Sequence, residues 1–235
     1  MLNRWSNNAI IRQEQIESGL DITFNNVFLP IFIEYICSYK PQRVLEVGAG
    51  TGHMSKELAK QNLSITAIEP SVGMYKVAKE VLSESNVELL MSTPADLAEC
   101  EKYDLAFSHL VAHVVEDLEC FLGSVAIHIK KKGNFIFSIP HPCFFNDYKK
   151  IFDKSHNYML PLATEISFKI TKDNKNEICG VPYYHRPLSH YINCIIKSGF
   201  NIDEFKEIYP DDKVQMLYGS LWDKPRYCMF ICYKK

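Results

Sequence analysis

The stretch Val44-Leu45-Glu46-Val47-Gly48-Ala49-Gly50-Thr51-Gly52 decides the fold of this 235-residue chain. It begins as a short apolar run, which is typical of a buried strand, and the segment 54–60 that follows it is typical of a helix. Glycines in the connecting loop permit positive φ angles and let a ligand approach the backbone closely. Because ligands of open α/β sheets bind at the carboxyl ends of strands, the stretch predicts a ligand-binding loop.

Strand-like and helix-like segments alternate along the rest of the chain. Strands are expected at 43–47, 63–68, 87–90, 103–108, 134–139, 200–208 and 227–233. Helices are expected at 9–18, 24–39, 54–60, 71–82, 118–132 and 188–198, where apolar residues recur with helical spacing. The fifth of these helices would end at Gly133 and carry Lys130-Lys131-Lys132 in its last turn. Such alternation predicts an α/β fold with a parallel sheet covered by helices on both faces.

The chain length suits one domain, which we divide into four parts. Residues 1–42 form an N-terminal helical cap, and residues 43–140 form the ligand-binding core. Residues 141–187 interrupt the alternation as an insertion, and residues 188–235 supply a final helix and two strands.

The insertion is rich in aromatic residues and contains a hairpin-like pair around Asp173-Asn174-Lys175-Asn176. The first 40 residues are surplus to the sheet and also carry aromatic side chains. We therefore expect residues 1–30 and 141–187 to close together as a lid over a small, largely apolar molecule. The alternative is that both segments only cover sheet edges.

The spacing of the glycines separates this loop from a dinucleotide-binding loop. The G-x-G-x-x-G fingerprint would require a third glycine at position 53, which is His53. Glu46 also argues against a dinucleotide, because a pyrophosphate prefers a helix N-terminus without a competing anion. A ligand that carries positive charge suits this acidic loop better, although the glycines alone are also compatible with a purely structural turn.

Two more carboxylates follow the next strands. Glu69 ends the second expected strand, where a carboxylate can accept hydrogen bonds from both hydroxyls of a ribose. Asp96 follows the third, where it can accept a hydrogen bond from an adenine amino group. Each of them is also a possible helix or turn cap. Their succession after Glu46 favours a nucleoside-like ligand.

These motifs resemble those of the class I S-adenosylmethionine (SAM)-dependent methyltransferases. The resemblance rests on LEVGAGTG (45–52), IEPS (68–71), TPADL (93–97), YDLAFSHLVAHV (103–114) and HRPLSHYINCIIKSGF (185–200). It implies a Rossmann-like, doubly wound sheet of seven strands in the order 3-2-1-4-5-7-6, with strand 7 antiparallel. It also implies that SAM is the cofactor.

The resemblance further implies a set of cofactor-binding residues. They are Glu46, Gly48, Ala49, Gly50, Gly52, Glu69, Pro70, Met74, Ala95, Asp96, Leu97, Ser108, His109 and His113. His109 and His113 stand four residues apart, but no nearby carboxylate or cysteine completes a zinc motif, so no metal site is expected.

Candidates for chemistry lie after the fifth strand and in the insertion. Methyl transfer depends largely on positioning, and a general base adds to it where the acceptor begins protonated. His141 directly follows the fifth strand, so we expect it near the methyl group, with a purely structural role as an equal alternative. His185 and Tyr184 are further candidates, although their aromatic cluster is more typical of a hydrophobic lid.

The composition limits the kinds of molecule that the protein is expected to bind. The net charge is -2 and no basic block occurs beyond Lys130-Lys131-Lys132, which does not indicate nucleic-acid binding. Eight scattered cysteines without a CxxC pair are typical of reduced thiols in the cytoplasm. No apolar stretch has the length of a membrane span. We expect a cytoplasmic monomer or homodimer with a small-molecule substrate.

We therefore predict a methyltransferase that acts on an oxygen or nitrogen, and less readily a carbon, of a small metabolite. A non-catalytic SAM-binding protein remains an alternative, because the cofactor motifs are clearer than the catalytic residues. A nicotinamide-dependent oxidoreductase or epimerase is disfavoured by Glu46 and His53. An amide or adenine-N6 methyltransferase is disfavoured because Ser108-His109-Leu110-Val111 replaces the Asn/Asp-Pro-Pro-aromatic motif.

Overall fold

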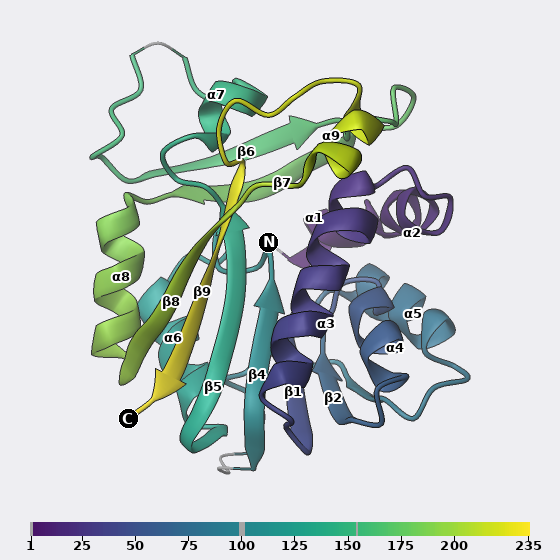
Figure 1. Ribbon diagram of the computed structural model, residues 1–235, viewed down its shortest axis with the longest axis vertical. Coiled ribbons are helices and arrows are strands. Elements are labelled where there is room, and N and C mark those ends of the chain that lie inside the picture. The colour runs from purple at the N-terminus through teal and green to yellow at the C-terminus, as the bar shows by residue number, and fades with distance from the viewer. Residues whose placement is uncertain (1, 99–101, 154) are drawn as a thin grey trace.

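The computed structural model describes residues 2–98, 102–153 and 155–235 and is built on a seven-stranded sheet (Figure 1). The sheet strands are β1 (Arg43–Val47), β2 (Ser64–Ile68), β3 (Glu88–Leu90), β4 (Tyr103–His109), β5 (Ile129–Pro140), β8 (Phe200–Ile208) and β9 (Tyr227–Lys234). A separate hairpin is formed by β6 (Leu162–Phe168) and β7 (Ile178–His185).

The spatial order of the sheet is β3-β2-β1-β4-β5-β9-β8. Because β6 and β7 lie outside it, β8 and β9 are its sixth and seventh strands, and the order is the expected 3-2-1-4-5-7-6. Strands β1 to β5 pair in parallel, whereas β9 is antiparallel to both β5 and β8. The expected doubly wound fold is therefore confirmed, and the parallel strands bring their carboxyl ends to one edge.

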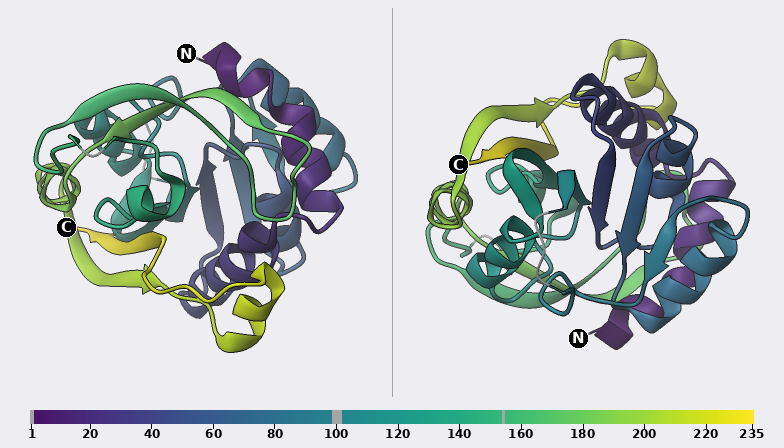
Figure 2. Two further views of the ribbon diagram at one scale, coloured as in Figure 1. Left: turned by 90° about the horizontal axis from the view of Figure 1, so that it is seen from above. Right: turned by 90° about the horizontal axis from the view of Figure 1, so that it is seen from below.

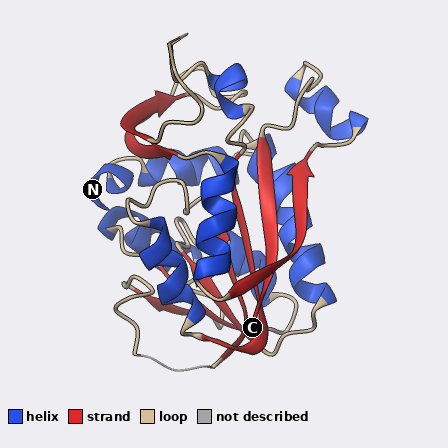
Figure 3. Cartoon of the chain, turned by 90° about the vertical axis from the view of Figure 1, so that its left-hand side faces the viewer, coloured by secondary structure: helices blue, strands red, loops and turns tan. Residues whose placement is uncertain are grey.

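Helices cover both faces of the sheet (Figure 3). Their bounds are α1 (Leu2–Ser6), α2 (Ala9–Glu17), the π-helix η1 (Thr23–Phe28), α3 (Leu29–Ser38), α4 (His53–Ala59), α5 (Val72–Val81), α6 (Leu118–Ala126), α7 (Phe145–Lys149), α8 (Leu188–Lys197) and α9 (Asp212–Tyr218). One core lies between the sheet and α6 and α8, and a second lies between the sheet and η1, α3 and α4. No described helix is long and apolar enough to cross a membrane.

The helix expected at 118–132 is shorter than its sequence pattern predicts. Helix α6 ends at Ala126, and the lysines at 130–132 lie in β5, where Lys130 forms an ion pair with Asp104 at 2.6 Å. A Cβ atom at Gly133 would lie 2.7 Å from the carbonyl oxygen of Asp104. Gly133 is therefore required by the close approach of β4, not by a helix end, and the helical interpretation of this segment was wrong.

The hairpin β6–β7 arches over the carboxyl ends of the sheet strands and reaches the N-terminal helices (Figure 2, left). The side chain of Asn8, between α1 and α2, forms two hydrogen bonds with the backbone of Cys179 in β7. Its Nδ2 donates to the carbonyl oxygen of Cys179 at 3.0 Å, and its Oδ1 accepts from the amide of Cys179 at 2.9 Å. The N-terminal segment and the insertion thus form one joined cover.

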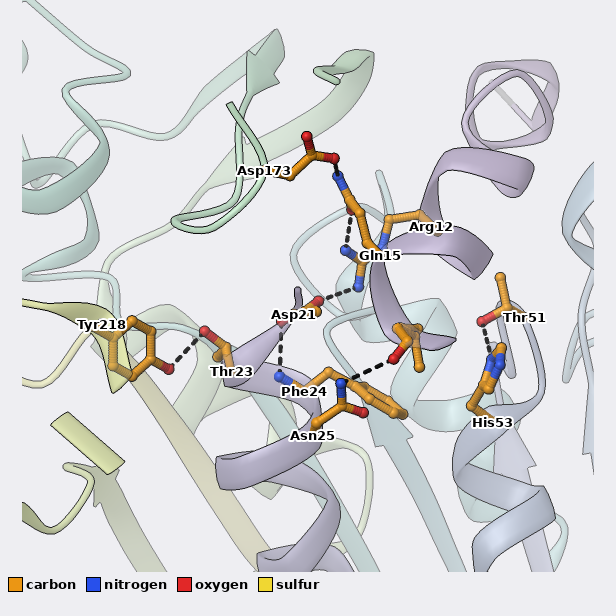
Figure 4. Close-up of polar contacts among 11 residues, drawn as sticks. Arg12, Gln15, Asp21, Thr23, Phe24, Asn25, Thr51, His53, Asp173 and Tyr218 are labelled. Carbon is orange, nitrogen blue, oxygen red and sulfur yellow. Dashed lines mark hydrogen bonds and ion pairs between the residues drawn. The ribbon is translucent and has the colours of Figure 1, made fainter. Parts of the chain in front are cut away.

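A second link joins α2 to the turn of the hairpin (Figure 4). The buried Gln15 donates from Nε2 to Asp173 at 3.0 Å and accepts from Arg12 at 2.7 Å. Arg12 also forms an ion pair with Asp21 at 2.6 Å. The backbone amide of Asn176, the Gln15 amide and the other donors around Asp173 hold the pKa of Asp173 well below its usual range. We call Arg12, Gln15, Asp21 and Asp173 the lid network.

We expect the substitution Gln15→Ala to lower the free energy of unfolding by about 1.5–3 kcal/mol, because it removes two hydrogen bonds to charged groups inside the cover. Amide hydrogen exchange should accelerate in the hairpin turn at 170–178. Gln13→Ala is the matched control, since Gln13 lies on the same helix and its side chain donates to the exposed Glu17 outside the lid network. Equal losses of stability in the two variants would contradict a structural role for the lid network.

Candidate functional site

A cavity of about 460 Å³ lies at the carboxyl ends of the parallel strands. The glycine loop and the end of β4 form its floor. Its walls come from residues before position 30, such as Trp5, Asp21 and Phe28, and from the insertion, such as Phe145 and Tyr183. Both cover segments therefore line one cavity beside the glycine loop, which confirms the predicted lid.

The glycine loop owes its path to backbone conformations that favour glycine. Gly48 and Gly50 have φ angles of +76° and +56°. A Cβ atom at Gly48 would lie only 2.5 Å from a methyl carbon of Val111, whereas one at Gly50 would meet open space. The loop therefore packs tightly against the end of β4 at Gly48 and leaves its surface open for a ligand at Gly50.

Glu69 lies at the end of β2 and is held by backbone donors on both sides. The amide of Gly50 donates to Oε2 and the amide of Ser71 donates to Oε1, each at 2.8 Å. The carboxylate is buried yet lines the cavity, so its remaining lone pairs can accept hydrogen bonds from a ligand. Burial raises the pKa of Glu69 to about 7, and the two amide donors limit that rise.

Glu46 lies deeper, near the end of β1 and beneath the loop. Its carboxyl accepts a hydrogen bond from the hydroxyl of Ser55 in α4. Burial raises the pKa of Glu46 to about 8, and the negative charge of Glu69 adds to that rise. The cavity floor therefore holds two carboxyls that ionise readily only when a positive group or a strong donor approaches them.

The predicted cofactor-binding residues fall into two groups. Those that line the cavity are Glu46, Gly48, Ala49, Gly50, Glu69, Pro70, Met74, His109 and His113. Gly52 instead precedes α4 with a φ of +80°, and Ser108 is buried and donates to the carbonyl oxygen of Val47 at 2.8 Å. These two residues shape the floor without facing its space.

The loop after β3 lies outside the cavity. Ala95, Asp96 and Leu97 are not among its lining residues, and the exposed carboxylate of Asp96 accepts from the hydroxyl of Thr93 at 2.6 Å. The expected adenine contact of Asp96 is thus not preformed in this structure. Strand β3, which precedes this loop, has only three residues, and all three pair with β2.

His141 does not reach the cavity, which corrects the expectation that it lies near the reacting methyl group. Its Nε2 lies 3.1 Å from a carboxylate oxygen of Glu207 in β8, and its Nδ1 accepts from the amide of Cys143 at 3.2 Å. Its backbone amide continues the pairing toward β9 by donating to Arg226. The ring is consequently drawn toward β8, away from the sheet edge that carries the glycine loop.

His185 and Tyr184 also lie away from the cavity, and this is a second correction. Both line a separate, open depression beside α8. The imidazole of His185 is 2.8 Å from the carbonyl oxygen of Tyr158, and the ring of Tyr184 lies under the guanidinium of Arg186. Successive residues of a strand point to opposite sides, so Tyr183 faces the cavity where Tyr184 cannot.

Several cavity residues were missed in the sequence. Arg12 and Asp21 bring an ion pair to its wall, and Tyr227 at the start of β9 adds a half-buried tyrosine. No local pattern marks these residues, because they come from a loop, a short helix and a distant strand. Among the described residues, no group of three or more histidines, cysteines or carboxylates could hold a metal ion.

His109 at the end of β4 and His113 in the loop after it place two imidazoles in the cavity lining, in addition to His53 of α4. Phe24, Phe28 and Phe32 surround the ring of His109, with ring centroids 4.3–5.9 Å away. Burial lowers the pKa of His109 and His113 to about 3, so both are neutral at physiological pH. The part of the cavity around His109 therefore presents aromatic faces and a neutral imidazole.

The two floor carboxyls predict an unusual pH dependence. A carboxyl whose pKa is raised in the fold stabilises it fully below the unfolded value near 4.3, and this contribution is lost as the pH rises through the folded value. For Glu46 that loss accumulates as the pH rises above the unfolded value and is complete near the folded pKa of about 8. We expect the ligand-free protein to lose several kcal/mol of unfolding free energy between about pH 6 and pH 9.

Denaturant unfolding over that pH range measures the effect. Glu46→Gln should flatten the dependence, because the amide cannot ionise. Glu57→Gln, on the outer side of α4, should keep the slope of the unchanged protein. If Glu46→Gln kept the slope of the unchanged protein, Glu46 would make no contribution to the pH dependence of the unfolding free energy.

Comparison with known proteins places the core in a family. Residues 45–137 match the family described as "Methyltransferase domain". A malonyl-[acyl-carrier protein] O-methyltransferase of Priestia megaterium is 30% identical over 97 residues, which are 40% of this chain and 35% of that protein. A ubiquinone biosynthesis O-methyltransferase of Rickettsia felis is 30% identical over 128 residues, which are 52% of each chain. The chain thus spans about a third to a half of the length of these relatives.

Solved structures share the architecture. A putative S-adenosylmethionine-dependent methyltransferase of Listeria monocytogenes superposes with a TM-score of 0.63 at 24% identity, over 83% of this chain and 91% of that one. This likeness concerns the fold. Residues 45–137 therefore match a methyltransferase domain, and the sheet to which they belong has the class I, SAM-dependent methyltransferase fold.

Proposed function

We propose that this chain is a SAM-dependent methyltransferase that transfers a methyl group to an oxygen or nitrogen atom, less readily a carbon atom, of a small molecule. The observation that carries the proposal is the Gly50–Glu69–Ser71 arrangement at the edge of an enclosed aromatic cavity. It combines a site for a ribose-bearing cation with a separate space for an acceptor.

The residues present fit SAM by their chemistry. Glu69 has lone pairs left for two ribose hydroxyls, and its negative charge, like that of Glu46, favours a ligand that carries a sulfonium and an ammonium. Gly50 leaves open space above the loop. Met74 and Pro70 add apolar surface beside Glu69. When bound, SAM would supply an electrophilic methyl group whose departure leaves a neutral thioether.

The protein contributes enclosure and orientation to such a reaction. In this proposal residues 43–140 hold the cofactor, and residues 1–42 and 141–187 wall the acceptor within a single domain. The aromatic walls exclude water from the sulfonium and hold the acceptor in line with it. A cavity of about 460 Å³ is within the range that small molecules occupy.

The similar proteins support an oxygen acceptor. The two curated relatives are named as O-methyltransferases, one acting on malonyl-acyl carrier protein and one in ubiquinone biosynthesis. Their similarity covers 40% and 52% of this chain, so the acceptor must be inferred from the residues that line the cavity.

A non-catalytic SAM-binding protein is the second candidate. It is favoured by the absence of His141, His185 and Tyr184 from the cavity lining. Turnover distinguishes the two candidates, because a binding protein releases no S-adenosylhomocysteine in the presence of any acceptor.

We expect Glu69→Ala to weaken binding of SAM by about 1–3 kcal/mol, because it removes a charge-assisted acceptor of the ribose hydroxyls. Isothermal calorimetry measures this change. Glu80→Ala, an exposed carboxylate on α5, is the matched control and should bind SAM as the unchanged protein does. Undiminished affinity in Glu69→Ala would remove Glu69 from the cofactor site.

We also expect formation of S-adenosylhomocysteine to depend on an added acceptor. A panel of small carboxylic acids, phenols and amines, assayed with SAM, should contain compounds that raise its formation well above the acceptor-free rate. Tight SAM binding without turnover on any of them would favour the non-catalytic candidate.

A further inference from the structure

The ring of His109 is tied to the neighbouring strand through Ser138. His109 ends β4 and is the register partner of Ser138 in β5. The Nδ1 atom of His109 lies 2.9 Å from the hydroxyl oxygen of Ser138. The amide of Leu110 donates to the same hydroxyl at 3.3 Å and to the carbonyl oxygen of Ser138 at 3.1 Å.

The hydrogen bonding of Ser138 determines which nitrogen of His109 carries the proton. Its hydroxyl has a single proton and is fully buried. Its oxygen accepts from Leu110, and within the described part of the chain His109 Nδ1 is the only acceptor recorded for its proton. The opposite arrangement would bury an unpaired hydroxyl proton at a cost of about 1–3 kcal/mol. Ser138 therefore donates to Nδ1, and the ring proton of His109 is on Nε2.

This tautomer makes His109 a donor toward the cavity. The imidazole lines the cavity, and no described residue bonds its Nε2. Three phenylalanine rings pack around it, and burial lowers its pKa to about 3. A neutral ring with Nδ1 occupied and a proton on Nε2 can donate a hydrogen bond to a bound molecule but cannot take a proton from it.

We propose that His109 donates its Nε2–H to the methyl-accepting atom and that this atom is an oxygen that arrives ionised, as in a carboxylate or an acidic phenol. A hydrogen bond from a neutral donor is strengthened when the acceptor carries charge, so this site discriminates in favour of an oxyanion. The inference rests on the proposed function, and it narrows the acceptor class of the same cavity.

Methyl transfer to such an oxygen balances without a protein base. A lone pair of the oxyanion forms the new O–C bond while the S–C bond breaks and its electron pair stays on sulfur. The negative oxygen and the positive sulfonium become a neutral ester or ether and a neutral thioether. No proton leaves the acceptor in this step, which agrees with a cavity whose imidazoles are poor bases.

The other groups around the cavity are compatible with this role. The charge of Arg12 lowers the pKa of His109 and the charge of Asp21 raises it. Arg12 and Asp21 also form an ion pair with each other. Tyr227 packs on Phe28, as His109 does, and burial raises its pKa well above the ordinary value. Its phenol therefore stays protonated as a second neutral donor.

The tautomer can be read directly by NMR of the nitrogen-labelled full-length protein, without a substrate. The two ring nitrogens of a neutral histidine have distinct shifts, and we expect those of His109 to report protonated Nε2 and bare Nδ1. Ser138→Ala should shift the Nδ1 resonance, whereas Ser124→Ala, on α6, should not. A protonated Nδ1 in the unchanged protein would overturn the proposal.

The charge preference can be tested with para-nitrophenol, whose ionised form alone absorbs visible light. At a pH equal to its pKa in water, binding to the protein loaded with S-adenosylhomocysteine should raise the visible absorbance, reporting a preference of about tenfold or more for the phenolate. His109→Phe should abolish the preference, and His109→Gln, which keeps a donor, should retain part of it. His190→Phe, an exposed histidine on α8, is the control.

The outcomes distinguish a failure of the proposed function from a failure of the role proposed for His109. If calorimetry shows no binding of S-adenosylhomocysteine, the proposed function fails. If it binds but para-nitrophenol binds as the neutral phenol, or neither form binds, only the role of His109 fails.

Discussion

The carboxylate of Glu69, held between the amides of Gly50 and Ser71, is the interaction on which the site depends. The hydrogen bond from Gly50 ties the glycine loop after β1 to the end of β2, and the bond from Ser71 fixes the carboxylate within its own loop, each at 2.8 Å. One carboxylate can link two successive loops because parallel strands bring both loops to the same edge of the sheet. The burial that makes this link rigid also raises the pKa of the carboxyl, so the same contact that organises the loop prepares it for a ligand that supplies positive charge or donors.

The order of the sheet, the glycine loop and the lid could be predicted from the sequence, because each has a local signal. Strand and helix periodicities mark the core, and the spacing of Glu46, Gly48 and Gly50 marks the loop. The lid was predictable because residues 1–30 precede the first strand of the sheet and residues 141–187 interrupt the alternation of strands and helices. Confirmation came from Phe28 and Tyr183, which line the same cavity although they are far apart in the chain.

The catalytic residues could not be predicted in this way, because side-chain direction depends on tertiary pairing. His141 follows β5 in sequence, but the antiparallel strands β9 and β8 draw its ring toward Glu207. The lysines at 130–132 follow an apolar helical stripe that ends at Ile129. Ile129 nevertheless pairs with Tyr103 of β4, and these lysines belong to β5. Conversely, Ser138 has no motif at all. Its importance appears only when β5 lies beside β4 and brings its hydroxyl to His109.

The charges around the cavity bear on the order in which the cofactor and the acceptor bind. The charged or ionisable side chains that line the cavity are the carboxyls of Glu46, Glu69, Asp21 and Glu116 and the cations Arg12 and Lys149, so the ligand-free cavity offers an anionic acceptor no net positive charge. A bound sulfonium and ammonium would add positive charge at the place where the acceptor oxygen must lie. If the acceptor is an oxyanion oriented by His109, the cofactor must bind first, since it provides the attraction that a neutral imidazole and phenol alone cannot. The raised pKa values of Glu46 and Glu69 fit this order, because the floor carboxyls ionise fully only when the cation arrives.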